Sequence, residues 1–255
     1  MLFRRQVRAP QPRAQESIDL ALGAECGGDV VRVAVRRHPS ARRLTLRVRA
    51  ATRDVTLTAP LSVPLATAES FVQRHRAWVE ARLVRLPDNV PFADGAVVPL
   101  RGEPHRIVHR PGARGTCWLE RNEAGAGLIC VAGDAPHLAR RVRDFLKRQA
   151  RADLAEAVRR HATALAVEVG PITLRDTSSR WGSCAADGAL SFSWRLILAP
   201  PFVLDYLAAH EVAHRLEMNH GPRYWRNVER IFPGRRAAEA WLRTNGAGLH
   251  RYGAS

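Results

Sequence analysis

Apolar and polar residues alternate along the first half of the chain with a period of two, which is typical of half-buried β-strands. The alternating segments lie at residues 31–35, 44–48 and 55–57, and shorter apolar runs follow at residues 105–108, 117–119 and 128–131. Turn-prone residues separate the first three segments. The pattern predicts a β-rich N-terminal portion over residues 30–133, after an N-terminal tail at residues 1–29.

Two segments have helical periodicity. Residues 67–86 predict one helix with Thr67 as its N-cap and with Phe71, His75, Trp78 and Val79 on one face. From Asp134 to Gly170 apolar residues recur at helical spacing, which predicts one long helix or two with a break. Strand patterns at residues 172–174 and 190–198 flank a loop at residues 179–184, and a further helix opens after Pro201. We therefore expect an α+β fold, with a second domain over residues 134–255.

Composition narrows the functional class. The 255 residues include 40 basic and 24 acidic side chains, and residues 1–150 carry 26 of the basic and 14 of the acidic ones. Such a field attracts polyanions, so nucleic acid is a candidate partner of the basic N-terminal half. A solvated basic surface, or an arginine-rich genome, would explain the same charge. With no secretory leader and no apolar run of about 18 residues, we expect a cytoplasmic protein with no membrane association.

The helix after Pro201 contains the motif His210-Glu-Val-Ala-His214. Residues four apart lie about 40° apart around a helix, so both imidazoles can reach one zinc ion. Glu211 follows the first histidine, where it can act on a water without ligating the metal. This spacing is typical of zinc-dependent hydrolases.

A third histidine, His220, follows a natural helix stop at Asn219-His-Gly-Pro222. On a continuing helix His220 would point away from the metal, whereas a chain reversal would make it the third ligand. Three protein ligands leave one position open, which is typical of a catalytic zinc site. The alternatives are two core histidines without metal, or a closed structural zinc site. Cys184 is assigned to packing or loop structure.

These motifs resemble the YgjP-like family of zinc metallopeptidases, relatives of the SprT-like and WLM zincins. The resemblance is carried by Ser179-Arg-Trp-Gly-Ser-Cys184, Leu190-Ser-Phe-Ser-Trp-Arg195, the HExxH motif, Glu217-Met-Asn-His220 and Pro222-Arg-Tyr-Trp225. It implies a zincin-like catalytic domain that binds one Zn²⁺ through His210, His214 and His220, with Glu211 as the acid/base. In zincins, the strand in the position of residues 190–198 often pairs with an extended peptide through its edge.

Other residues are candidates for supporting roles. Arg180, Arg223 and Tyr224 are candidates for stabilising the oxyanion, and Trp181 for contacting substrate, although an ordinary core role suits Trp181 as well. Glu217 or Glu229 could orient a ligand histidine. Besides a peptidase, the motifs fit a metal-dependent hydrolase of a nucleotide, a SprT-like protease acting on DNA-associated proteins, or a non-catalytic binding module.

Overall fold

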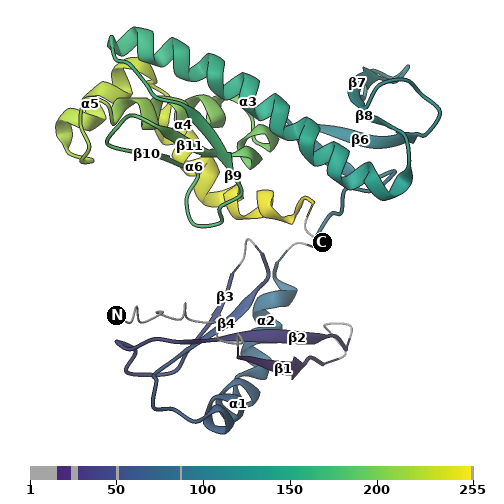
Figure 1. Cartoon of the computed structure of the whole chain (residues 1–255), viewed down its shortest axis with the longest axis vertical. Helices are drawn as coiled ribbons and strands as arrows, with labels where there is room; N and C mark the ends of the chain where they lie inside the picture. The colour runs from purple at the N-terminus through teal and green to yellow at the C-terminus, as the bar shows by residue number, and fades with distance from the viewer. Residues whose placement is uncertain (1–15, 24–27, 50–51, 87, 254–255) are drawn as a thin grey trace, which may run out of the picture. The chain divides into compact units, whose positions relative to one another are not determined.

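The chain forms two compact units, residues 1–86 and 87–255, which are described separately. The computed structural model describes residues 16–23, 28–49, 52–86 and 88–253, shown in Figure 1. Much of the tail expected at residues 1–29 lies outside the described residues.

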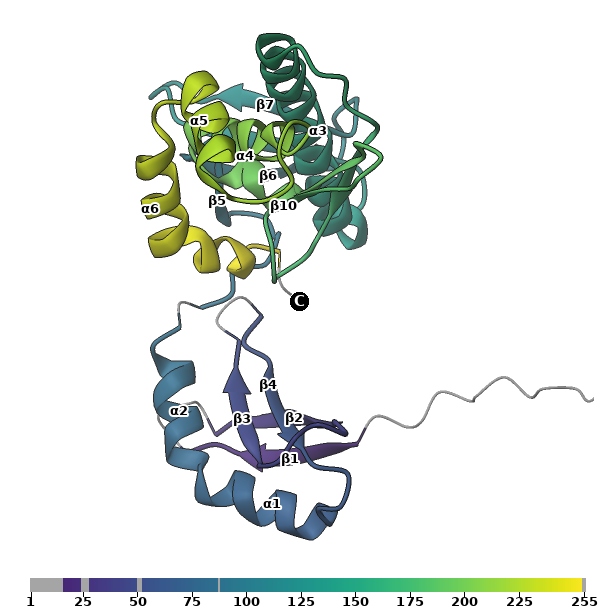
Figure 2. The same ribbon diagram turned by 90° about the vertical axis from the view of Figure 1, so that its left-hand side faces the viewer.

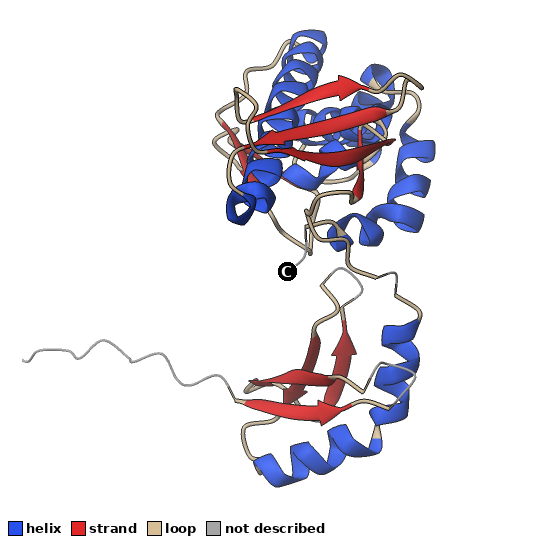
Figure 3. Cartoon of the chain, turned by 90° about the vertical axis from the view of Figure 1, so that its right-hand side faces the viewer, coloured by secondary structure: helices blue, strands red, loops and turns tan. Residues whose placement is uncertain are grey.

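The first unit is a four-stranded sheet with two helices on one face (Figures 2 and 3). The strand order is β1-β2-β4-β3, and β2 runs parallel to β4 while the other pairs are antiparallel. The elements are β1 (Ser17–Ala21), β2 (Val30–Arg37), β3 (Thr45–Val48), β4 (Val55–Ala59), α1 (Leu65–Arg74) and α2 (Arg76–Val84). The three strands expected from residues 31–57 are confirmed.

Two expectations for this unit are wrong. Strand β1 falls inside the predicted tail, because its five residues are too few to stand out although Ile18 and Leu20 are buried. The single helix predicted at residues 67–86 is two helices interrupted at His75, and the first begins after Pro64, so Thr67 is not its N-cap. Because of the interruption at His75, the Val79 side chain packs in the core, whereas the Trp78 side chain is 46% exposed.

The second unit places two small sheets and several helices around one core. One sheet has the order β5-β6-β8-β7 and the other β10-β11-β9. The strands are β5 (Val97–Leu100), β6 (Glu103–Arg110), β7 (Cys117–Arg121), β8 (Gly127–Ala132), β9 (Ile172–Arg175), β10 (Gly182–Cys184) and β11 (Leu190–Ser193). The α-helices are α3 (Leu138–Leu165), α4 (Pro201–Ala213), α5 (Pro222–Ile231) and α6 (Arg235–Asn245), and 3-10 turns occupy Ala135–His137, Trp194–Leu198 and Gly246–Arg251.

Helix α3 joins the two sheets of this unit, as Figure 1 shows. The predicted apolar positions, including Val142, Leu146 and Leu154, are buried along one uninterrupted helix. It ends at Leu165, and its C-cap Ala166 adopts a left-handed conformation with φ 54°, four residues before the expected stop at Gly170. Within the described residues, no helix combines the length and apolar character needed to cross a membrane.

Asp134, where the sequence pattern changes from strands to a helix and where a second domain is expected to begin, lies inside the second unit. Ile107 and Ile129 of the β5–β8 sheet are buried in the same core as Val142 and Leu146 of α3. The sheet before Asp134 and the helix after it therefore share one hydrophobic core, and the division between compact units falls at residues 86 and 87.

The strand expected at residues 190–198 is shorter than predicted. β11 stops at Ser193, and Trp194–Leu198 forms a 3-10 turn. The reason is Arg195, which is buried and forms a two-bond ion pair with Asp176 at 2.6 and 3.2 Å. Its Nη1 also donates to the carbonyls of Leu249, His250 and Tyr252. The expected loop at residues 179–184 is also wrong in part, since Gly182–Cys184 is strand β10.

We expect the substitution Arg195→Met to destabilise the second unit by about 2–3 kcal/mol, because buried carbonyls lose their donor and the Asp176 side chain, 44% exposed, loses its charged partner. Urea unfolding followed by tryptophan fluorescence measures this. The control is Arg159→Met, which removes a pair whose side chains are 70% and 58% exposed and should cost less than about 1 kcal/mol. Equal losses would show that Arg195 does not fasten the C-terminal turn.

Candidate metal centre

Helix α4 carries polar side chains through the core of the second unit. Pro201 occupies its first turn, where a missing N–H costs nothing, and most of its residues are buried. Glu211 and His214 are only 4% and 8% exposed, and His210 is half-buried. Such groups are costly in an apolar environment unless they find partners.

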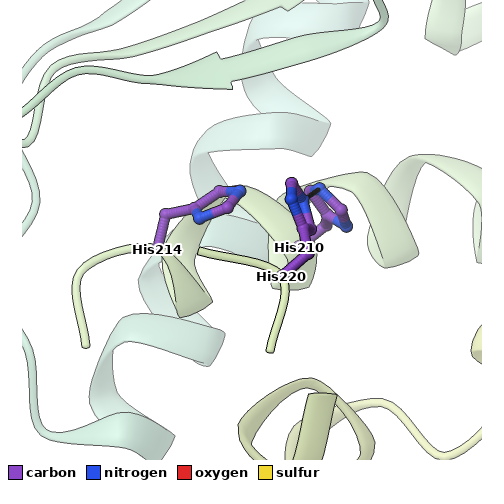
Figure 4. Close-up of side chains that lie close together, drawn as sticks. All are labelled: His210, His214 and His220. Atoms are coloured by element: carbon purple, nitrogen blue, oxygen red, sulfur yellow. Dashed lines mark hydrogen bonds between the residues drawn. The ribbon is translucent and has the colours of Figure 1, made fainter. Parts of the chain in front are cut away.

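The chain reverses directly after the helix. α4 ends at Ala213, six residues before the stop expected at Asn219, and the N–H groups of Leu216 and Glu217 both bond to the Ala213 carbonyl. This turn brings His220 back to the helix end, as Figure 4 shows. The third histidine therefore approaches the other two by the predicted reversal, with an earlier helix end.

The geometry of the three imidazoles fits a metal ion. One nitrogen of each of His210, His214 and His220 lies within 4.8 Å of the others. The Nε2 atoms of His210 and His220 are 3.1 Å apart. Two nitrogens bound to a tetrahedral zinc at about 2.0–2.1 Å lie about 3.3–3.4 Å apart. The His210–His220 pair thus has nearly the separation that a single zinc ion requires, and the 4.8 Å limit on the whole cluster is wider than that separation.

The pKa shifts of His210 and His214 agree with this fit. Burial, with the neighbouring histidines, lowers the pKa of His210 to about 3, and burial lowers the pKa of His214. Neutral imidazole is the form that ligates metals. The His214 Nδ1–H donates to the Glu217 carbonyl at 3.1 Å, which leaves the Nε2 lone pair for the centre.

A chain of hydrogen bonds orients His210. The Tyr206 hydroxyl donates to Glu239 Oε1 at 2.8 Å, so its oxygen can accept the Nδ1–H of His210 at 3.3 Å. Arg235 in turn donates to the Glu239 carboxylate. The carboxylates expected to act this way do not: Glu229 pairs with Arg235 at 2.9 Å, and Glu217 uses its backbone. Tyr206 lies one helical turn before His210, a spacing that could have suggested the contact.

Glu211 is held beside the edge of a sheet. A Cβ atom on Gly182 of β10 would lie only 2.4 Å from Glu211 Oε1, so the carboxylate occupies the space that glycine leaves. Burial raises the pKa of the Glu211 carboxyl to about 7, and the positive charge of Arg180 opposes that shift. The Gly182 position in the Trp-Gly-Ser segment thus has a steric reason.

The remaining candidates have separate positions. Tyr224 is fully buried, stacks on His214 with ring centroids 4.6 Å apart, and donates its hydroxyl to the His210 carbonyl at 3.0 Å. Arg223 is 79% exposed and lies 3.5 Å from Glu217. Trp181 is partly buried against the His250 ring, whereas Arg180 is exposed and close enough to interact with Glu211. The structure therefore brings Tyr224 and Arg180 to the site and leaves Arg223 at its margin.

The edge of the neighbouring sheet belongs to β10. β11 pairs with β10 on one side and with β9 on the other. The expectation that the strand beginning at residue 190 offers a free edge is therefore wrong, because both of its edges are occupied. Strand β10, which touches Glu211 through Gly182, stands at the end of the sheet.

We expect Tyr206→Phe to weaken metal binding by about 10-fold, because the His210 Nδ1–H loses its acceptor and the ring its fixed orientation. Competition with a chromophoric zinc chelator measures the affinity. Tyr252→Phe is the matched control, since Tyr252 follows the 3-10 turn at Gly246–Arg251 and is not among the residues hydrogen-bonded to His210. An unchanged affinity in Tyr206→Phe would show that the contact does not orient the ring.

Comparison with known proteins assigns the chain to a family. A search of curated proteins returns no match. A solved structure similar to this chain is the metallopeptidase zymogen of Pyrococcus abyssi abylysin, with 21% sequence identity, a TM-score of 0.33, and coverage of 36% of this chain and 92% of that chain. The family model described as the YgjP-like metallopeptidase domain matches residues 42–245. The chain therefore belongs to the YgjP-like metallopeptidase family.

Proposed function

We propose that this chain is a zinc-dependent peptidase whose zincin-like catalytic portion spans residues 134–255. Its ligands are His210, His214 and His220, and Glu211 is its general base. The observation that carries the proposal is the meeting of three imidazoles with one buried carboxylate that stands outside the ligand cluster. The family supports metallopeptidase chemistry in general.

The donor set favours zinc. Among the described residues, this cluster holds imidazoles alone and no thiolate or carboxylate. Three histidines leave a fourth position for water or substrate, as in catalytic zinc sites. When bound, zinc supplies a Lewis acid that polarises a carbonyl and makes water nucleophilic near neutral pH.

Glu211 moves the protons in this mechanism. Its carboxylate lies between the ligand helix and β10, so it can accept the proton of the attacking water and later deliver it to the leaving amine. Arg180 contributes positive charge near Glu211, where negative charge develops on the carbonyl oxygen. Tyr224 serves as a positioning residue, because its hydroxyl is already bonded to the His210 carbonyl.

An extended peptide would bind along β10. A strand at the end of a sheet presents backbone N–H and C=O groups that a peptide can pair with. Pairing with Gly182–Cys184 would bring a scissile carbonyl next to Glu211, since Gly182 touches that carboxylate. The substrate is thus expected to be an unfolded or extended segment of protein.

We expect Glu211→Gln to retain bound zinc and to lose more than about 100-fold in the hydrolysis of denatured proteins, because the amide cannot accept a proton. His214→Ala should lose the metal itself. Zinc content and product analysis on the same preparations separate the two effects. Hydrolysis at the wild-type rate by Glu211→Gln would refute the assigned base.

Assays on the same preparations distinguish between the alternative substrates. The zinc-loaded wild-type chain is offered denatured casein, nucleoside triphosphates and protein–DNA complexes, with and without a chelator. Chelator-sensitive cleavage of casein supports the peptidase. Hydrolysis of nucleoside triphosphates without proteolysis would replace it with a nucleotide hydrolase.

We expect Gly182→Ala to reduce peptide hydrolysis by at least about 100-fold while zinc remains bound, because the new methyl group would displace the Glu211 carboxylate. To restore an ordinary contact of 3.4 Å from 2.4 Å, the carboxylate must move by about 1 Å, a shift that can cost about 100-fold in rate. Gly112→Ala is the control, since a Cβ there meets nothing within 4 Å. Full activity of Gly182→Ala would show that the carboxylate position is not critical.

A further inference from the structure

Within the described residues of the first unit, one face of the sheet has no helix over it. α1 and α2 pack on the other face, where Val33, Val35 and Leu57 are buried with Val72 and Val79 (Figures 2 and 3). Because side chains alternate between the faces of a strand, the residues between these valines and leucines point to the opposite side. That open face is made of Ser17, Asp19, Ala21, Val30, Arg32, Ala34, Arg36, Thr45, Arg47, Thr56 and Thr58.

The open face is positively charged. Arg36 and Arg47 are exposed, and within the described part of the chain no hydrogen bond or ion pair engages either guanidinium. The acidic residue among the strands of this face is Asp19, which lies 3.4 Å from Arg32 with both side chains more than 60% exposed. Two arginines are thus left without neutralisation.

The strand register separates these two arginines. Arg36 is paired with Thr58, and Arg47 with Thr56, on opposite sides of β4. β2 and β3 are therefore about 10 Å apart, which is two interstrand spacings. Small hydroxyl side chains lie between them, so the guanidinium groups can reach two separate phosphates with threonine hydroxyls as further donors.

We propose that this open sheet face, carrying Arg36 and Arg47, docks the phosphate backbone of double-stranded nucleic acid. The face has charge complementary to a polyanion and, among its described residues, no aromatic side chain. Single-strand binding relies on aromatic rings that stack on bases, whereas a duplex presents its phosphates on the outside. Recognition is therefore independent of base sequence.

A lipid surface fits this face less well. Membrane-surface binding combines basic residues with apolar side chains that enter the acyl region. The exposed apolar residues of the helices, such as Trp78 and Val84, belong to α2, which covers the other side of the sheet. On the open face Val30, at the first position of β2, is the large apolar side chain among the described residues. Threonine, serine and alanine occupy the positions around Arg36 and Arg47.

The test uses the full chain and a fluorescently labelled 20-base-pair duplex, with anisotropy titrations from 50 to 200 mM NaCl. We expect Arg36→Gln/Arg47→Gln to weaken binding roughly 10- to 100-fold at about 100 mM salt. The slope of log affinity against log salt should fall in magnitude by about 2, because two phosphate contacts are lost. Peptide hydrolysis should be unchanged, which keeps this result independent of the proposed enzyme activity.

The matched control removes the same charge from the helices. Arg74→Gln/Arg82→Gln changes two exposed arginines on α1 and α2 and should alter duplex affinity by less than about threefold. Equal losses in both variants would overturn the proposal in favour of a general electrostatic field. The proposal would also be overturned if the wild-type chain did not bind the duplex. It would be overturned as well if the chain bound a single-stranded 20-mer, or phosphatidylserine vesicles, more tightly than the duplex.

Discussion

The second unit depends on one physical constraint: helix α4 carries a carboxylate and imidazoles into an apolar core, where each polar group needs a partner or a reason to lack one. The surroundings supply the partners from distant segments. Glu239 reaches His210 through Tyr206, the Glu217 carbonyl fixes His214, and Gly182 leaves room for the Glu211 carboxylate. The polar residues of the helix thus fix how α6, the loop after α4 and strand β10 pack around it.

Local pattern predicted much of this architecture. The strands of the first half follow a period of two, the apolar face of α3 follows the helical period, and the position of His220 after a helix stop indicated a third imidazole beside the motif. These features are decided by neighbours in sequence. The features that the sequence did not predict depend on contacts between residues far apart in the chain. Residues 194–198 leave the sheet because Arg195 bonds to carbonyls at residues 249–252, and no local pattern contains that information.

The distribution of charge is a second example of what the sequence alone can and cannot predict. Residues 1–86 have 16 basic and 7 acidic side chains, against 24 and 17 in residues 87–255. The excess is therefore visible as arithmetic, but the arithmetic assigns it to no surface. Only the sheet of the first unit shows that β2 alternates buried valines with outward arginines. The family match, over residues 42–245, extends across parts of both units, so the family pattern extends beyond the helix that bears the motif.

The short reversal between His214 and His220 also affects how a metal would bind. A flexible loop that had to close on an ion would lose conformational entropy at that moment. Here the loop is already tied down, because Arg215 donates to the carbonyls of Glu168 and Ala186 and the first N–H groups bond to Ala213. The segment from His214 to His220 is therefore ordered when the chain folds, and an ion bound by the proposed ligands would meet a preorganised site. Lengthening this loop by one residue would therefore change the metal affinity, although all three histidines would still be present in the sequence.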